Sequence, residues 1–177
     1  MSQDSPTRST DHTGRDPSVA SGWLPANIVG EWPSLDTRQS IVSRRQSLYE
    51  AMQELEAAVA RASGQPDWLD EVEKALSTLM GALDRHVAEI EAPNGLFDDV
   101  LDRAPRLRPL VDSLRDDHEE LRAACRSALE EAGTRPDMKA GEMRRKVLPI
   151  LGRLSMHRQD GAELLFDAHN VDVAAGD

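Results

Sequence analysis

The sequence is poor in cysteine, in clustered basic residues and in long apolar runs. Its single cysteine, Cys125, excludes an internal disulfide framework and is typical of a reducing compartment. No 18 apolar residues run together, so no membrane-spanning helix is expected, and the first residues lack the pattern of a secretion signal. The net charge of −11 argues against nucleic acid or an anionic membrane as a partner. These absences predict a cytoplasmic protein.

Aromatic residues are also scarce, at 3%, whereas Ala, Leu, Glu, Asp and Arg dominate, as is usual in helical proteins. Residues 1–35 are rich in Ser, Thr, Asp, Gly and Pro, and we expect them to form a flexible N-terminal tail. Trp23 and Trp32 in this tail are expected to dock onto the folded domain or, as the alternative, onto a protein partner. The folded domain is assigned to residues 36–173.

Apolar residues recur every three or four positions in four stretches of this domain, which predicts four amphipathic helices. Asp67 is a candidate N-cap for the second helix and Gly133 a candidate left-handed C-cap for the third. Pro149 should either kink the fourth helix or mark a late start. The sequence therefore predicts an all-α fold, an up-down-up-down four-helix bundle. The expected helices cover residues 36 or 37 to 62, 68 to about 92, 106–132, and 139 or 141 to 168, with a short segment at 96–101.

An eight-residue pattern occurs twice, at residues 79–86 and 150–157. Each copy ends in a histidine, His86 or His157. Counted back from that histidine, Leu stands three residues earlier, Gly five residues earlier and an aliphatic residue seven residues earlier. The first and third helices carry a related pattern, in which Arg45 and His118 have apolar neighbours at −4, +3 and +7. The chain is therefore interpreted as two repeated αα-hairpins, each of which directs two side chains toward a shared centre.

This pattern resembles the hemerythrin-like (HHE cation-binding) family over about residues 40–173. The resemblance rests on residues 114–121 around His118, on His86 followed by Leu96-Phe97, and on residues 157–166. It implies a four-helix bundle that binds two irons for O₂ binding, oxygen or iron sensing, or nitric oxide chemistry. It also places His86, His118 and His157 at the positions of iron ligands, and residues 166–173 are similar to a bacterial subgroup.

Three positions depart from the family pattern. Arg45 replaces the histidine of the first helix, and Ile90 and Gly161 replace the two carboxylates that bridge the irons. Neither an isoleucine nor a glycine side chain can bind a metal. The resemblance therefore implies the fold more strongly than a diiron site.

Neighbouring acids are candidate replacements for those carboxylates. Glu89 and Asp160 each follow a histidine by three residues, a spacing at which both side chains can share a metal. At about 100° per residue, however, they lie at the edge of the core, where they can also orient the imidazole or meet solvent. Glu91 and Glu163 are further alternatives. The candidate metal ligands are thus the three histidines with Glu89 and Asp160.

Three functional hypotheses follow. The first is a non-enzymatic hemerythrin-like domain whose site is reduced to one Fe, Zn or Mn ion, or to no metal, with a role in metal, redox or oxygen-linked sensing. The second is a structural or adaptor bundle that acts through protein contacts. The third, a diiron enzyme acting on O₂ or nitric oxide, is disfavoured by the missing carboxylates. Cys125 is expected to be a buried structural thiol, and His169 to lie at the rim of the fold rather than to bind metal.

Overall fold

The computed structural model describes residues 35–61 and 67–174, and the side chains of residues 46–61 and 67–170. These residues form helices and no strand, so the all-α prediction is confirmed. The tail with Trp23 and Trp32, and the side chain of Arg45, lie outside the described part. The elements are α1 (Leu35–Ala60), α2 (Trp68–Ile90), α3 (Leu96–Arg103), the 3₁₀ turn η2 (Pro105–Leu107), α4 (Arg108–Thr134) and α5 (Ala140–Ala174).

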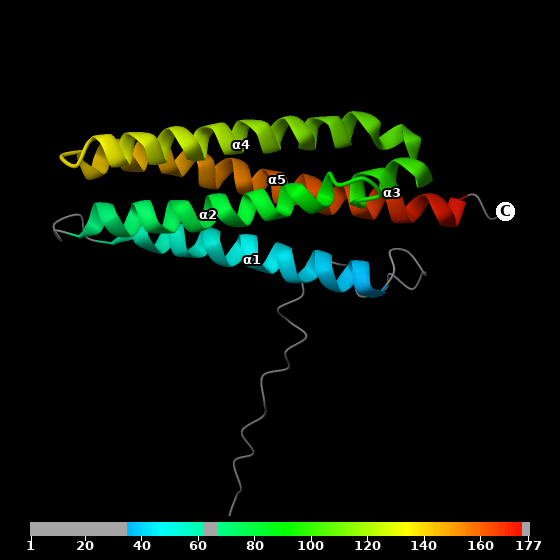
Figure 1. Ribbon diagram of the computed structural model, residues 1–177. Helices are drawn as coiled ribbons and strands as arrows, with labels where there is room; N and C mark the ends of the chain where they lie inside the picture. Colours follow the sequence, from blue (N-terminus) through cyan, green and yellow to red (C-terminus); the bar gives the residue numbers. More distant parts are fainter. Residues whose placement is uncertain (1–34, 62–66, 175–177) are drawn as a thin grey trace, which may run out of the picture.

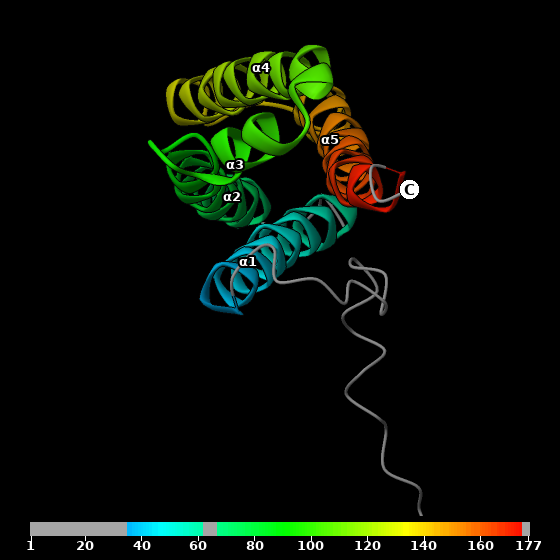
Figure 2. The ribbon, with the colours of Figure 1, turned by 90° about the vertical axis from the view of Figure 1, so that its right-hand side faces the viewer.

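Four long helices lie side by side, and each runs opposite in direction to the long helix before it in the chain (Figure 1). Helix α2 packs against both α1 and α4, and α5 packs along α4. The end-on view shows the short helix α3 beside the end of α2, on the same side as α4 (Figure 2). None of the helices in the described residues is long and apolar enough to cross a membrane.

The start of α2 at Trp68 agrees with the prediction, but the capping of this helix does not. The Asp67 side chain makes no capping hydrogen bond, and its backbone carbonyl accepts the Glu71 N–H at 3.0 Å instead. Asp67 has φ −97° and ψ 3°, outside the extended conformation from which an N-cap side chain reaches back to the helix. Helix α2 ends at Ile90, shortly before the turn in which Asn94 adopts φ 59°.

The predicted left-handed C-cap at Gly133 is wrong. No glycine of the described residues has positive φ, and α4 continues through Gly133 to Thr134. There the Thr134 hydroxyl donates a hydrogen bond to the Glu130 carbonyl at 2.8 Å. A side chain thus supplies a donor to one of the carbonyl groups in the last turn of the helix. Helix α5 likewise runs through Pro149, which therefore does not mark a late start.

Two apolar cores lie one after the other along the long helices. The predicted stripe residues Leu55, Leu79 and Leu121 are fully buried in the larger core. The smaller core is closed by α3 and η2 and contains Phe97 and Leu114. The larger core contains residues of α1, α2, α4 and α5. The smaller core contains residues of α3 and η2, together with the last residue of α2, the start of α4 and the later part of α5.

Candidate metal centre

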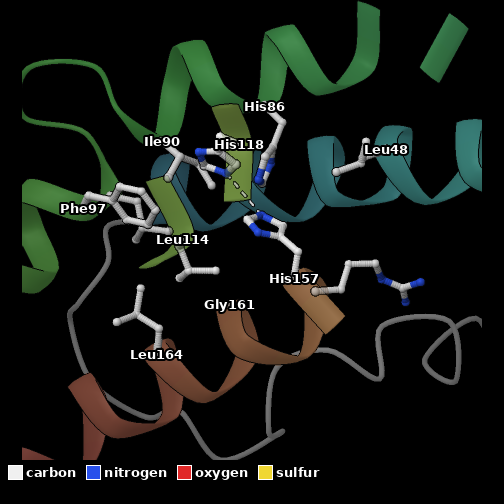
Figure 3. A pocket seen from close by; sticks show the side chains of 11 residues that line it. Leu48, His86, Ile90, Phe97, Leu114, His118, His157, Gly161 and Leu164 are labelled. Atoms are coloured by element: carbon white, nitrogen blue, oxygen red, sulfur yellow. Dashed lines mark hydrogen bonds between the residues drawn. The ribbon is translucent and has the colours of Figure 1, made fainter. Parts of the chain in front are cut away.

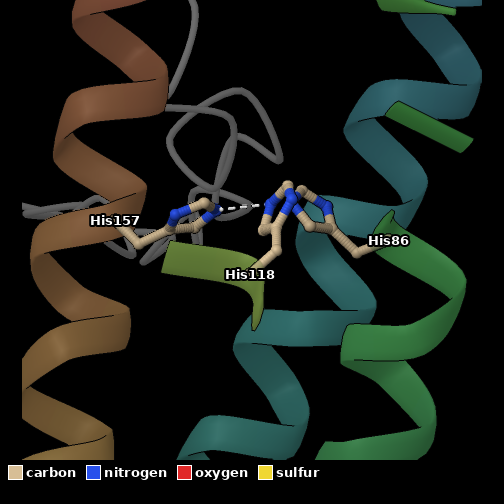
Figure 4. A group of neighbouring side chains, drawn as sticks. All are labelled: His86, His118 and His157. Atoms are coloured by element: carbon tan, nitrogen blue, oxygen red, sulfur yellow. Dashed lines mark hydrogen bonds between the residues drawn. The ribbon is translucent and has the colours of Figure 1, made fainter. Parts of the chain in front are cut away.

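Three histidines form a buried polar layer between the two cores. His86 comes from α2, His118 from α4 and His157 from α5. Their exposed fractions are 7%, 1% and 5%, respectively. They point toward one another, and one nitrogen of each ring lies within 4.8 Å of the corresponding nitrogens of the other two (Figure 4).

Local helix geometry explains why each imidazole faces inward. A buried leucine precedes each histidine by three or four residues, at Leu83, Leu114 and Leu154. Residues at this spacing share a helix face, so the histidine points the same way as its leucine. Position on the apolar stripe thus buries the ring, and the packing of three helices brings the rings together.

One pair of ring nitrogens has the spacing that a single metal ion requires. Nε2 of His118 and Nε2 of His157 are 3.1 Å apart. Nitrogens about 2.0–2.1 Å from one ion lie about 3.0 Å apart at right angles and about 3.4 Å apart in a tetrahedron. Two such nitrogens can be separated by at most about 4.2 Å, so a pair at the 4.8 Å limit would have to close by about 0.6 Å. A single ion at the centre therefore requires the imidazoles to move closer together.

Burial sets the protonation of the central imidazole. It lowers the pKa of His118 to about 3, and the proximity of His157 and Arg122 acts in the same direction. Nδ1 of His118 lies 2.5 Å from Oε1 of Glu91, whose side chain is 31% exposed. A carboxylate favours the charged imidazolium, but desolvation of the ring is the larger effect. His118 is therefore neutral at pH 7 and retains a lone pair for a ligand.

A second carboxylate stands behind His157. Oδ2 of Asp117 lies 3.6 Å from Nδ1 of His157, beyond hydrogen-bond distance. Both the Nε and an Nη of Arg153 donate to the other oxygen, Oδ1, at 2.9 and 2.6 Å. Arg153 also pairs with Glu120. The arginine therefore fixes Asp117 with Oδ2 directed at the imidazole.

A cavity opens beside the three histidines (Figure 3). The cavity has a volume of about 40 Å³. Ile90 and Gly161 both line it, and no Asp or Glu is among its described lining residues. Phe97 closes one side and stacks on the His118 ring, with centroids 5.9 Å apart and planes at 16°. The walls are mainly apolar, and the polar side chains among the described lining residues are the three imidazoles and Arg158.

The structure brings together three of the five residues named from the sequence. Among the described residues, the group able to hold a metal consists of His86, His118 and His157 and contains neither Glu89 nor Asp160. These two acids are half-buried, and their role as ligands stays a prediction.

Three further acidic residues occupy different places around the histidines. Glu163 is exposed, and Glu91 contacts the far nitrogen of His118 rather than the shared centre. Asp117 was not identified from the sequence, because its contacts with Arg153 and His157 exist only once α4 packs on α5. The one local signal was its position next to His118. Cys125 is buried, as expected.

Comparisons with protein-family models, with curated proteins and with solved structures find no match to this chain. The resemblance to hemerythrin-like proteins therefore stays a prediction, and the metal centre is argued from the geometry of the three histidines.

Proposed function

We propose that this chain is a hemerythrin-like four-helix bundle that binds one divalent transition-metal ion through His86, His118 and His157. The two repeated hairpins would be α1 with α2 and α4 with α5. Each of these pairs packs closely, and α2 contacts α4 between them. Three buried imidazoles that converge from three helices are the observation that carries the proposal.

The composition of the cavity wall favours one ion over two. A diiron centre needs carboxylates to bridge the metals and balance their charge, whereas Ile90 and Gly161 line the cavity and the resemblance assigns the carboxylates to these two positions. Three imidazoles suit a single Fe, Zn or Mn ion. The ion would supply a Lewis-acidic or redox-active centre with at least one position open to the cavity. The protein supplies the ligands, an apolar enclosure and room for a small molecule.

The size of the cavity favours binding or sensing over the turnover of a large substrate. A region of about 40 Å³ accommodates a few atoms, because a single water needs roughly 10–15 Å³ of such a cavity. We propose a non-enzymatic role in metal, redox or oxygen-linked sensing, because the described lining residues lack the carboxylates that a diiron enzyme acting on O₂ or nitric oxide needs. The competing hypothesis is a structural bundle in which the imidazoles are hydrogen-bonded core residues.

Metal content of variant proteins separates these two hypotheses. Protein purified without a histidine tag and reconstituted with Fe(II), Zn(II) or Mn(II) should bind about one ion per chain by elemental analysis. His86→Ala and His157→Ala should lose that ion, because two imidazoles hold it far more weakly than three. His169→Ala is the matched control, since His169 is half-buried on α5 and does not belong to the cluster.

Metal content that is equal in the wild type, His86→Ala and His157→Ala would reject the proposed site and favour the structural bundle. Two ions per wild-type chain would instead favour the diiron hypothesis. Circular dichroism of each variant checks that the helices remain folded.

A further inference from the structure

Two carboxylates stand behind the histidines, outside the set of three metal ligands. Glu91, at the C-cap of α2, contacts Nδ1 of His118, and Asp117 on α4 faces Nδ1 of His157. In both pairs the acid approaches the nitrogen opposite the one that faces the shared centre. Carboxylates in this position fix the tautomer of a metal-binding histidine and raise its basicity.

One assignment of the protons fits these contacts. His118 Nδ1 is 2.5 Å from Glu91, which fits an N–H donating to a carboxylate and leaves the lone pair on Nε2. That Nε2 lies 3.1 Å from Nε2 of His157, so in this assignment the proton between them would belong to His157. His157 Nδ1 would then carry a lone pair toward Oδ2 of Asp117, which lies 3.6 Å away. In this assignment the two rings are different tautomers before a metal binds.

Metal binding requires both rings to present Nε2 lone pairs. We propose that Glu91 and Asp117 are positioning residues for the metal, and that binding moves the proton of His157 from Nε2 to Nδ1, where Asp117 accepts its hydrogen bond. The proton leaves Nε2 to solvent and another returns to Nδ1, so the net number of protons is unchanged. Oδ2 of Asp117 has only to close from 3.6 Å to about 2.8 Å, the usual length of a charge-assisted hydrogen bond.

Arg153 makes Asp117 suited to this role. Two of its nitrogens bond Oδ1 and leave Oδ2 for the imidazole. Arg153 precedes His157 by one turn on α5, so the acid, the arginine and the histidine join α4 to α5 at the level of the centre. This inference rests on the proposed metal site and assigns the residues that would tune it.

Metal affinity of isosteric variants tests the assignment. Asp117→Asn and Glu91→Gln should each lower the Zn(II) affinity by about 10–100-fold, measured by competition with a chelating dye. Glu120→Gln is the matched control, because Glu120 pairs with the same Arg153 but is 60% exposed and makes no described contact with a histidine. It should bind Zn(II) as the wild type does.

Imidazole ¹⁵N NMR provides a readout that a merely structural role would not change. Without metal, His118 should be protonated at Nδ1 and His157 at Nε2; with Zn(II), both should be protonated at Nδ1. In Asp117→Asn, His157 should no longer adopt the Nδ1–H form cleanly on loading.

The outcomes separate this inference from the proposed function. Wild-type binding with unchanged affinity in both variants, or a His157 that keeps its Nε2 proton on loading, would overturn the positioning role and leave the metal site intact. Absence of Zn(II) binding by the wild type would overturn both.

Discussion

At His118 and Cys125, burial acts on two groups of opposite type and leaves both uncharged. It lowers the pKa of the imidazole, whose protonated form is charged, and raises the pKa of the thiol, whose deprotonated form is charged. The imidazole thereby keeps the lone pair that a metal needs. The thiol remains protonated and unreactive, so two residues seven apart on one helix face have different chemical roles.

Cys125 should not react in the folded protein at pH 8. Burial, with a smaller contribution from the charge of Asp84, raises the pKa of its thiol to about 11, so the reactive thiolate is almost absent at that pH. Ellman's reagent should therefore label native protein far more slowly than protein unfolded in guanidinium chloride. The control is Ser155→Cys at an exposed position of α5, which should add one rapidly labelled thiol. Rapid labelling of Cys125 in the native wild type would contradict its structural role.

At the scale of elements, the turn between α2 and α3 holds the aromatic wall of the site. Helix α3 begins at Leu96 and places Phe97 on the face of His118. Gly95 precedes it, and a Cβ atom there would lie 2.6–2.8 Å from three backbone carbonyl oxygens. Backbone atoms cannot move aside as a flexible side chain can, so only glycine fits at this position.

Gly95→Ala should lower the free energy of unfolding by about 1–3 kcal/mol, the usual cost of forcing an extra methyl group into a packed region. Gly152→Ala is the opposite case, because Gly152 is an exposed helix residue and a Cβ atom added to it would meet no atom within 4 Å. It should raise the free energy of unfolding by about 0.5–1 kcal/mol, since alanine loses less backbone freedom on folding. Urea unfolding followed by circular dichroism measures both. A Gly95→Ala protein as stable as the wild type would show that the turn can rearrange.

At the scale of the whole molecule, the three histidines connect three helices at the boundary between the two cores. An ion held by His86, His118 and His157 would cross-link α2, α4 and α5. Neutral polar groups in this position cost desolvation free energy, which their hydrogen bonds offset only in part. Metal binding should therefore be visible in the stability of the entire fold.

Zn(II) should stabilise the wild type by about 2.7 kcal/mol at a free concentration 100 times the dissociation constant, provided that it binds only the folded state. The midpoint of urea unfolding should rise with Zn(II) and return after EDTA is added. His157→Ala should show no such rise. Equal shifts in the two proteins would mean that the ion binds elsewhere on this acidic chain.

The local sequence determined the helices and the inward direction of the histidines. Both depend on contacts three or four residues apart, so the stripe that ends at His86 or His157 could be read without a structure. The helix ends were predicted less well. Asp67 and Gly133 had residue types suited to capping, but the backbone adopted neither capping conformation. Preferences at helix ends amount to about 1 kcal/mol, and tertiary packing outweighs them.

The tertiary structure alone decided which charged groups support the histidines. Glu89 and Asp160 were expected near the rings from their spacing, whereas Glu91 and Asp117 make the described contacts with His118 and His157. The Asp117 contact joins residues forty apart in the chain and depends on the rotation of α4 against α5. Helix periodicity fixes the face on which a residue lies, but not which residue of a neighbouring helix it meets, because that is set by the packing of the cores on either side.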